Sequence, residues 1–183
     1  MNSAYRPQFT EDSGYTVIEL LVVMAVAAIL FAIGIPSFAG LLREAQLSTA
    51  TNDFFASINL ARAEAVQRGV RVDMVPAGDD GDWAKGWTVF VDENRNRRPD
   101  HGDLVIFRHG PSPDGMKITA NLTDSTVQYL AYSGSGRTRT HANAYRTQFG
   151  TFTLELGNKA RKIKLNFVGR PRVCNPEADP QNC

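Results

Sequence analysis

Hydrophobic positions near the start of the chain form one unbroken run. No charged or strongly polar side chain interrupts residues 20–35, LLVVMAVAAILFAIGI, and residues 15–19 extend the run to about 20 residues. A helix of that length spans the hydrocarbon core of a bilayer. A buried core helix of the same length would normally carry a polar face. The pattern therefore predicts a membrane-spanning segment within residues 15–38.

Beyond Pro36 the helical pattern continues but becomes one-sided. Apolar residues recur at spacings of three and four, and the charged residues lie off that stripe. Gly69 is a helix stop signal. We therefore expect one helix over residues 15–68, apolar on all sides in its first half and amphipathic in its second. The expected apolar stripe consists of Leu47, Ala50, Phe54, Ile58, Ala61 and Ala65.

After Gly69 the period of the pattern falls from 3.6 to 2, which predicts strands. Val72 and Met74 alternate with charged residues at the start of this region, and GNKA between the last two strands suggests a hairpin turn. An antiparallel sheet would press its apolar face onto the helix stripe, which gives an α+β fold with a β-rich domain over residues 69–183. The expected strands are residues 70–74, 87–91, 103–107, 126–132, 150–156 and 162–168.

Within the last of these strands and the residues after it, apolar and basic side chains alternate. Ile163, Leu165 and Phe167 are expected to face the same way, toward the helix. The basic residues Lys162, Lys164, Arg170 and Arg172 share the opposite parity. If the chain stays extended, they project from one face at roughly 6.5 Å intervals, a spacing that suits successive phosphates.

Composition fits a globular protein, with 43% hydrophobic and 21% charged residues among 183. A net charge of +1 gives no overall attraction to nucleic acid. The last part of the chain differs, because residues 137–183 carry 9 Lys and Arg against 3 Asp and Glu, a balance of +6. This asymmetry indicates an anionic partner for the C-terminal region, and the alternative is a solvated basic face.

The two cysteines, Cys174 and Cys183, enclose the polar segment NPEADPQN. Free thiols are usually buried, and this segment offers no apolar surroundings. A disulfide that closes a short loop in an oxidising compartment is therefore expected. The alternative is a pair of reduced thiols in a cytosolic tail.

Glu19 is the one acid in the apolar run. An ionised carboxylate in hydrocarbon costs several kcal/mol unless it finds a partner. The helix N-terminus offers partial positive charge, and cleavage after Gly14 would add the new amine of Tyr15. In a filament, Glu19 of one subunit could then meet the Tyr15 amine of its neighbour. The alternative is a glutamate that reaches the membrane surface.

The segment GYTVIELLVVMAVAAIL resembles the prepilin signature shared by type IV pilins and type II secretion pseudopilins. The resemblance implies that a prepilin peptidase removes residues 1–14 as a leader, that Tyr15 is N-methylated, and that Glu19 acts in subunit docking. It also implies a single-pass inner-membrane precursor with a periplasmic β-rich domain. The mature protein would then join other pilin subunits in a filament at the cell surface.

The segments ASINLARAEAVQRGVRVDMVP, WAKGWTVFVDENRNRRPD and FVGRPRVC resemble the GspH/FimT family of minor pilins and pseudopilins. The cysteine pair is typical of the pilin branch. FimT-like members bind DNA for natural transformation through a C-terminal Gly-Arg-x-Arg motif, and the matching residues are Gly169, Arg170 and Arg172. The alternatives are a structural minor pilin that primes assembly without binding DNA, and a minor pseudopilin of a type II secretion system.

A second Gly-Arg-x-Arg segment contains Arg137 and Arg139, in a loop rich in Ser, Thr and Gly, and would either add DNA contacts or remain solvated. Oxygen-bearing residues over 92–103 follow the spacing of a calcium loop, but Arg97 stands where that loop needs Gly, so a polar loop is the stronger interpretation. His101, His109 and His141 stand apart without a paired nucleophile. We therefore expect no enzyme, cofactor or metal site.

Overall fold

The computed structural model describes residues 14–183 except 79, 125–126, 142 and 144, and it leaves out the side chains of residues 33–37. Nearly all of the expected leader, residues 1–14, therefore lies outside the described residues. The chain divides into two compact units, Met1–Leu41 and Leu42–Cys183.

Helix α1, Val17–Arg68, contains 52 residues and continues through Pro36. It ends where the sequence predicted, because Gly69 follows with φ +68°, the left-handed conformation that closes many helices and suits glycine. Residues 42–68 of α1 belong to the second unit. The stripe predicted on this part of the helix is confirmed, since all six of its residues are buried.

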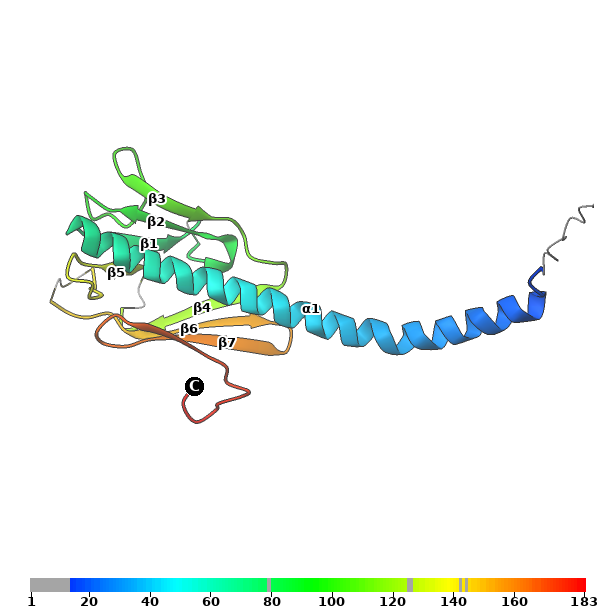
Figure 1. Ribbon diagram of the computed structural model, residues 1–183. Coiled ribbons are helices and arrows are strands. Elements are labelled where there is room, and N and C mark those ends of the chain that lie inside the picture. The colour runs from blue at the N-terminus through cyan, green and yellow to red at the C-terminus, as the bar shows by residue number, and fades with distance from the viewer. Residues whose placement is uncertain (1–13, 79, 125–126, 142, 144) are drawn as a thin grey trace, which may run out of the picture. The chain divides into compact units, whose positions relative to one another are not determined.

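The strands of the second unit form two four-stranded antiparallel sheets (Figure 1). The first sheet has the order β3-β2-β1-β5 and the second has the order β4-β6-β7-β8. A short 3₁₀ helix, Trp83–Lys85, precedes β2. The strands are β1 Val72–Pro76, β2 Trp87–Val91, β3 Leu104–His109, β4 Met116–Leu122, β5 Leu130–Tyr132, β6 Gly150–Leu156, β7 Lys159–Leu165 and β8 Pro171–Cys174.

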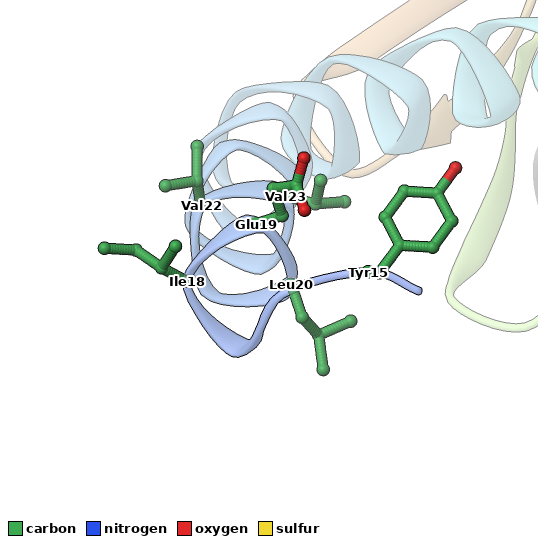
Figure 2. Close-up of a pocket in the computed structure, with 6 residues that line it drawn as sticks. All are labelled: Tyr15, Ile18, Glu19, Leu20, Val22 and Val23. Atoms are coloured by element: carbon green, nitrogen blue, oxygen red, sulfur yellow. The ribbon is translucent and has the colours of Figure 1, made fainter. Parts of the chain in front are cut away.

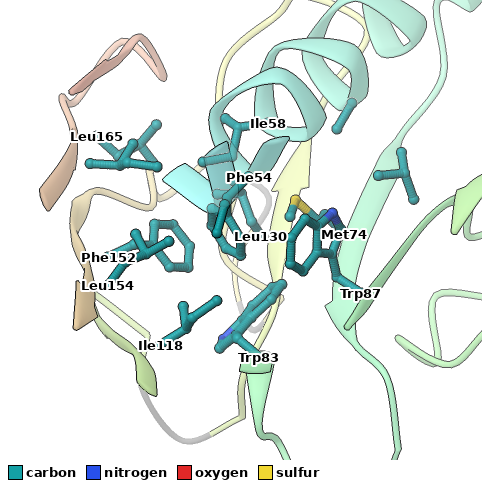
Figure 3. Packing of buried hydrophobic residues seen from close by; sticks show 14 of the residues in the cluster. Phe54, Ile58, Met74, Trp83, Trp87, Ile118, Leu130, Phe152, Leu154 and Leu165 are labelled. Atoms are coloured by element: carbon teal, nitrogen blue, oxygen red, sulfur yellow. The ribbon is translucent and has the colours of Figure 1, made fainter. Parts of the chain in front are cut away.

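A single large hydrophobic cluster joins α1 to both sheets (Figure 3). Phe54 of α1 lies at its centre, with ring centroids 5.4 Å from Trp83, 4.8 Å from Trp87 and 5.0 Å from Phe152. All members of the cluster come from residues 47–165, inside the second unit. Residues 42–183 thus contain every layer of this core and are expected to fold without the residues before them.

The expected α+β architecture is confirmed, with differences in detail. The hairpin between β6 and β7 is present, and Leu156 pairs with Lys159 across Gly157 and Asn158. Strands β4 and β8 were not predicted. Of the expected strand 126–132, residue 126 lies outside the described residues, and the described part forms a strand only at β5. Phe167 does not join Ile163 and Leu165 in the core, because β7 ends at Leu165 and Phe167 is 71% exposed.

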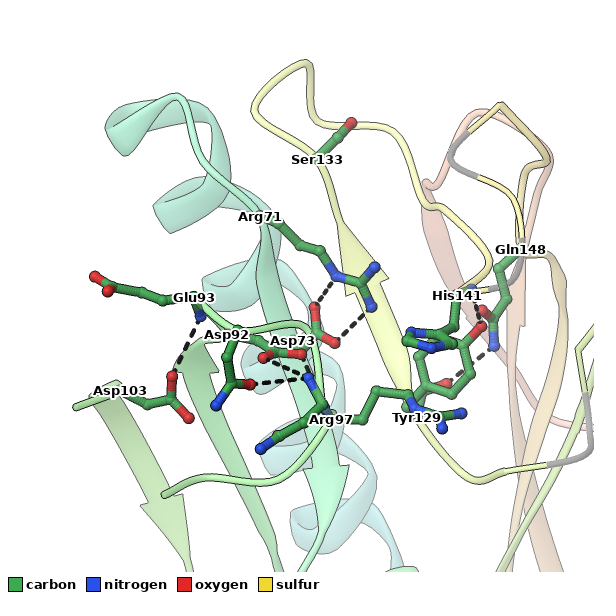
Figure 4. Close-up of polar contacts among 12 residues, drawn as sticks. Arg71, Asp73, Asp92, Glu93, Arg97, Asp103, Tyr129, Ser133, His141 and Gln148 are labelled. Atoms are coloured by element: carbon green, nitrogen blue, oxygen red, sulfur yellow. Dashed lines mark hydrogen bonds and ion pairs between the residues drawn. The ribbon is translucent and has the colours of Figure 1, made fainter. Parts of the chain in front are cut away.

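The face of the first sheet turned away from α1 carries a small hydrophobic cluster and, beside it, a polar network (Figure 4). Arg71 donates to both carboxylate oxygens of Asp73, at 2.6 and 2.7 Å. Asp73 is fully buried, although its alternation with Val72 and Met74 is typical of a strand with one solvent face. Loops that pack on this sheet remove the solvent face, so all five residues of β1 are buried.

The loop over residues 92–103 uses its own oxygens to hold its shape (Figure 4). Asp92 accepts hydrogen bonds from the backbone N–H groups of Asn96 and Arg97 at 3.1 and 2.9 Å. Asp103 accepts from the backbone of Glu93 and of Asp100. Among the residues described, no three acidic, histidine or cysteine side chains lie together in a position to hold a metal ion.

Candidate functional sites at the N-terminus and the C-terminal hairpin

The N-terminal segment places the expected processing site just outside the helix. Gly14, Tyr15 and Thr16 precede α1 and are exposed. Thr16 and Glu19 form a capping box: the backbone N–H and the hydroxyl of Thr16 both donate to the Glu19 carboxylate at 2.9 Å. The Thr16 hydroxyl accepts from the backbone N–H of Glu19 at 3.3 Å. Glu19 therefore already satisfies donors at the helix start within one chain.

Around Glu19 the surface is apolar and hollowed (Figure 2). Apolar side chains along the first turns of α1 are largely exposed, for example Ile18 at 70% and Phe31 at 66%. So large an apolar surface requires a covering. Within the described part of the chain, no helix combines the length and apolarity of a membrane span. The hollow is lined by Tyr15, Ile18, Glu19, Leu20, Val22 and Val23.

The chain does not stay extended after β7, so the condition for an even spacing of the four C-terminal basic residues is not met. A tight turn after β7 reverses the chain, so β8 runs antiparallel to β7. Asn166 forms this turn: its side-chain oxygen accepts from the backbone of Val168 and of Arg170, and its backbone carbonyl accepts from Gly169 at 2.9 Å. Gly169 has φ +80°, a conformation that other residues rarely adopt.

This reversal gathers the cations instead of spacing them out. Lys164 on β7 lies directly opposite Arg172 on β8, and Lys162 lies opposite Cys174. Side chains directly opposite each other in an antiparallel pair share a face and approach within about 5.5 Å at Cβ. A shallow groove is lined by Phe149, Gly150, Thr151, Lys164, Leu165, Asn166, Arg170 and Arg172.

The disulfide expected from the cysteine pair is present between Cys174 and Cys183, whose Cα atoms lie 5.6 Å apart. It closes residues 175–182, which we call the C-terminal loop. The backbone carbonyl of Asn182 in this loop accepts from Lys164 Nζ at 3.0 Å and from Arg172 Nη2 at 2.7 Å. Sequence patterns gave no sign of this contact, because a backbone atom makes it.

The two Gly-Arg-x-Arg segments meet in space. The Tyr132 hydroxyl donates to the Gly169 carbonyl at 2.8 Å, and a Cβ added to Gly169 would lie 3.0 Å from the backbone nitrogen of Thr138. Thr138 is buried, whereas its neighbour Arg137 is exposed and Arg139 is half-buried. Arg139 donates to the Thr138 carbonyl at 3.0 Å. The structure therefore places this loop beside the turn that carries Arg170.

Two protein-family patterns match the sequence of this chain. The family described as type II transport protein GspH matches residues 50–169, and the prokaryotic N-terminal methylation motif matches residues 11–35. This chain belongs to the GspH family. The GspH match includes Gly169 but stops before Arg170, so the arginines of the turn lie outside it.

One curated relative and two solved structures are similar to this chain. The pilin-like protein PilA1 of Thermus thermophilus is 30% identical over 162 residues, which cover 87% of this chain and 97% of PilA1. The crystal structure of the type IV minor pilin FimU of Pseudomonas aeruginosa has a TM-score of 0.58 and 18% identity, covering 73% of this chain and 92% of FimU. The minor pseudopilin EpsH from the Type 2 Secretion System of Vibrio cholerae has a TM-score of 0.50 and 12% identity, covering 72% of this chain and 98% of EpsH.

The chain is therefore a pilin-like protein of the GspH family, and it shares the fold of the type IV minor pilin FimU, a long N-terminal helix packed on antiparallel strands. The methylation motif associates it with pili and membranes.

Proposed function

We propose that this chain is a minor subunit of a type IV pilus with a structural and not an enzymatic role. A prepilin peptidase cuts after Gly14 and Tyr15 is N-methylated. Residues 15–38 lie in the inner membrane before assembly and in the filament core afterwards, while the β-rich domain is periplasmic. The observation that carries this proposal is the exposed apolar surface of residues 15–32, whose one charged side chain is Glu19. Lipid and neighbouring pilin helices can both cover such a surface.

Glu19 is the proposed docking residue. Its carboxylate caps the helix through Thr16 in the single chain. A carboxylate accepts several hydrogen bonds, so a neighbour's Tyr15 amine can bind it without displacing Thr16. In a filament core of low polarity, the charge of that amine offsets the cost of burying the carboxylate. Removal of Glu19 leaves the neighbour's amine without a partner.

Assembly tests this role of Glu19. In cells that carry Glu19→Ala, we expect the protein to remain in the membrane fraction and to be lost from sheared filaments. The control is Glu93→Ala, which removes an exposed acid of the second unit and is expected to leave incorporation unchanged. Equal recovery of the Glu19→Ala and parent proteins in sheared filaments would contradict the docking role. A deletion that stops exoprotein release and leaves pili intact would instead assign the chain to a type II secretion pseudopilus.

A DNA contact is the second function that the geometry favours. Lys164, Arg170 and Arg172 line one groove at the C-terminal hairpin, and the segment with Arg137 and Arg139 lies beside it. Lys162 lies on β7 two residues before Lys164, on the same face of the sheet. Arginine binds phosphate with a bidentate fork and without regard to sequence. The proposed ligand is therefore the phosphate backbone of double-stranded DNA, as in uptake for natural transformation.

Titration of residues 42–183 with duplex DNA at low salt tests this contact. We expect weak, sequence-independent binding, with a dissociation constant of roughly 10⁻⁴–10⁻⁶ M. Arg170→Ala with Arg172→Ala should abolish most of it. The matched control, Arg108→Ala with Lys117→Ala, removes the same charge from other exposed positions and should change binding little. Equal affinities of the two double variants would show that only net charge matters. A fragment that binds no DNA would indicate a purely structural minor pilin.

A further inference from the structure

The C-terminal loop gives the basic groove a feature that charge alone does not supply. A single oxygen atom, the Asn182 carbonyl, receives hydrogen bonds from both Lys164 and Arg172. Two positive charges repel each other, so the ammonium of Lys164 and the guanidinium of Arg172 would move apart without a shared acceptor. We propose that the C-terminal loop is a positioning element that holds these two side chains together for one stretch of phosphate backbone. This inference rests on the proposed DNA contact and concerns its affinity.

Internal hydrogen bonds of the loop fix the position of the Asn182 carbonyl. The Asp179 side chain accepts from the backbone N–H of Asn182 at 3.2 Å and from its side-chain amide at 3.0 Å. The Asp179 backbone donates to Asn175 and accepts from Cys183, at 2.9 and 3.0 Å. Glu177 forms an ion pair with Lys159 on β7 at 2.7 Å. The disulfide ties the end of the loop back to Cys174 on β8, so both ends of the C-terminal loop are held at the sheet.

The contact with Asn182 leaves most of the hydrogen-bonding capacity of the cations unused. A lysine ammonium has three donors and an arginine guanidinium has five, so each can bind phosphate while still bonded to the carbonyl. Holding a long side chain in place before binding reduces the conformational entropy lost on binding. The loop should therefore raise affinity for DNA without adding a charge or a phosphate contact.

Two substitutions at Asp179 separate positioning from charge. Asp179→Ala and Asp179→Asn remove the same negative charge, but only Asp179→Asn keeps a side-chain oxygen that can accept from Asn182. In residues 42–183, titrated with a mixed-sequence DNA duplex, Asp179→Ala should bind roughly three- to tenfold more weakly than Asp179→Asn. The dependence of log affinity on log salt should have the same slope for both, since no phosphate contact is lost. Arg172→Ala, in contrast, should lower that slope by roughly 1.

The possible outcomes distinguish a failure of the positioning role from a failure of the proposed DNA contact. If the parent fragment binds no DNA, the proposed DNA contact is wrong and the positioning role is wrong with it. If the parent binds and the two Asp179 variants bind equally, the positioning role alone is overturned. Thermal unfolding of each variant shows whether the domain is intact. Should Asp179→Ala fail to fold, Cys174→Ser with Cys183→Ser provides the test, and it should bind DNA more weakly than the parent with an unchanged salt slope.

Discussion

Phe54 contacts three aromatic rings at the junction of α1 with both sheets, so its removal leaves a void that its neighbours cannot fill (Figure 3). We expect Phe54→Ala to lower the free energy of unfolding of residues 42–183 by about 3–5 kcal/mol. Leu104→Ala is the control, because Leu104 is 47% exposed on the edge strand β3 and should cost much less. Chemical denaturation measures both, and equal losses would contradict the position of Phe54 in the core.

Asp73 makes stability depend on pH. Burial raises the pKa of Asp73 from 3.8 to about 6, and the nearby Asp92 adds to this effect, although Arg71 opposes it. Between these two values the folded protein holds a proton that the unfolded chain has lost. This contribution to stability is therefore full below about pH 4 and is lost as pH rises to about 6. The loss is on the order of 2–3 kcal/mol.

Denaturation of residues 42–183 at several pH values checks this behaviour of Asp73. Asp73→Asn cannot ionise, so the fall in stability between about pH 4 and 6 should be smaller than in the parent, even though Arg71 loses its charged partner. Asp114→Asn changes an exposed carboxyl and should keep the parental profile. Identical profiles for the parent and Asp73→Asn would exclude a raised pKa at Asp73.

Individual positions differed in how well the sequence revealed them. Glu19 and Arg172 stand out because a charge in an apolar run and a cluster of like charges are unusual in themselves. The burial of Asp73 depends on loops that are distant in sequence, and no local pattern shows that they cover β1. The Asn182 contact is made by a backbone carbonyl, so the identity of the side chain does not predict it.

The turn between β7 and β8 depends on Gly169. Its φ is +80°, and a Cβ added to it would lie 3.0 Å from both Thr138 and Tyr132, so these neighbours would have to shift slightly. Gly169→Ala should therefore destabilise the domain by about 1–2 kcal/mol, the usual cost of left-handed backbone in a residue with a Cβ. It should also weaken DNA binding, because Arg170 is carried by this turn. Gly102→Ala is a control, since Gly102 also has positive φ but open space around it. Equal DNA affinities of the two variants would contradict the role of the turn.

The sequence predicted helices and strands correctly where one face of the element packs on the core and the other faces solvent. The stripe on α1 and the β6–β7 hairpin were predicted because their periods of 3.6 and 2 are undisturbed. The extended path after Leu165 was mispredicted because Asn166 and Gly169 reverse the chain through side-chain and backbone hydrogen bonds. Strand β4 has the same period of 2, because Met116, Ile118 and Leu122 are buried and alternate with polar residues, so the sequence contained a strand signal that the prediction left out.

Charge is distributed unevenly over the protein, whose net charge is +1. Residues 69–136 contain seven Lys and Arg and ten Asp and Glu, a net charge of −3, whereas residues 137–183 have a net charge of +6. The antiparallel β7–β8 pair concentrates part of this positive charge at one groove. Such a local field attracts an anionic polymer at short range, within a Debye length of about 8 Å at physiological salt. The sequence predicted the sign of this field, and the fold determines its place.

The central claim is that the chain becomes a filament subunit through processing at Gly14. Mass spectrometry of the protein recovered from sheared pili tests it most directly. We predict a mature chain that begins with N-methylated Tyr15 and carries an intact Cys174–Cys183 disulfide. A chain that keeps Met1 and is recovered only from the soluble cytosolic fraction would contradict the account.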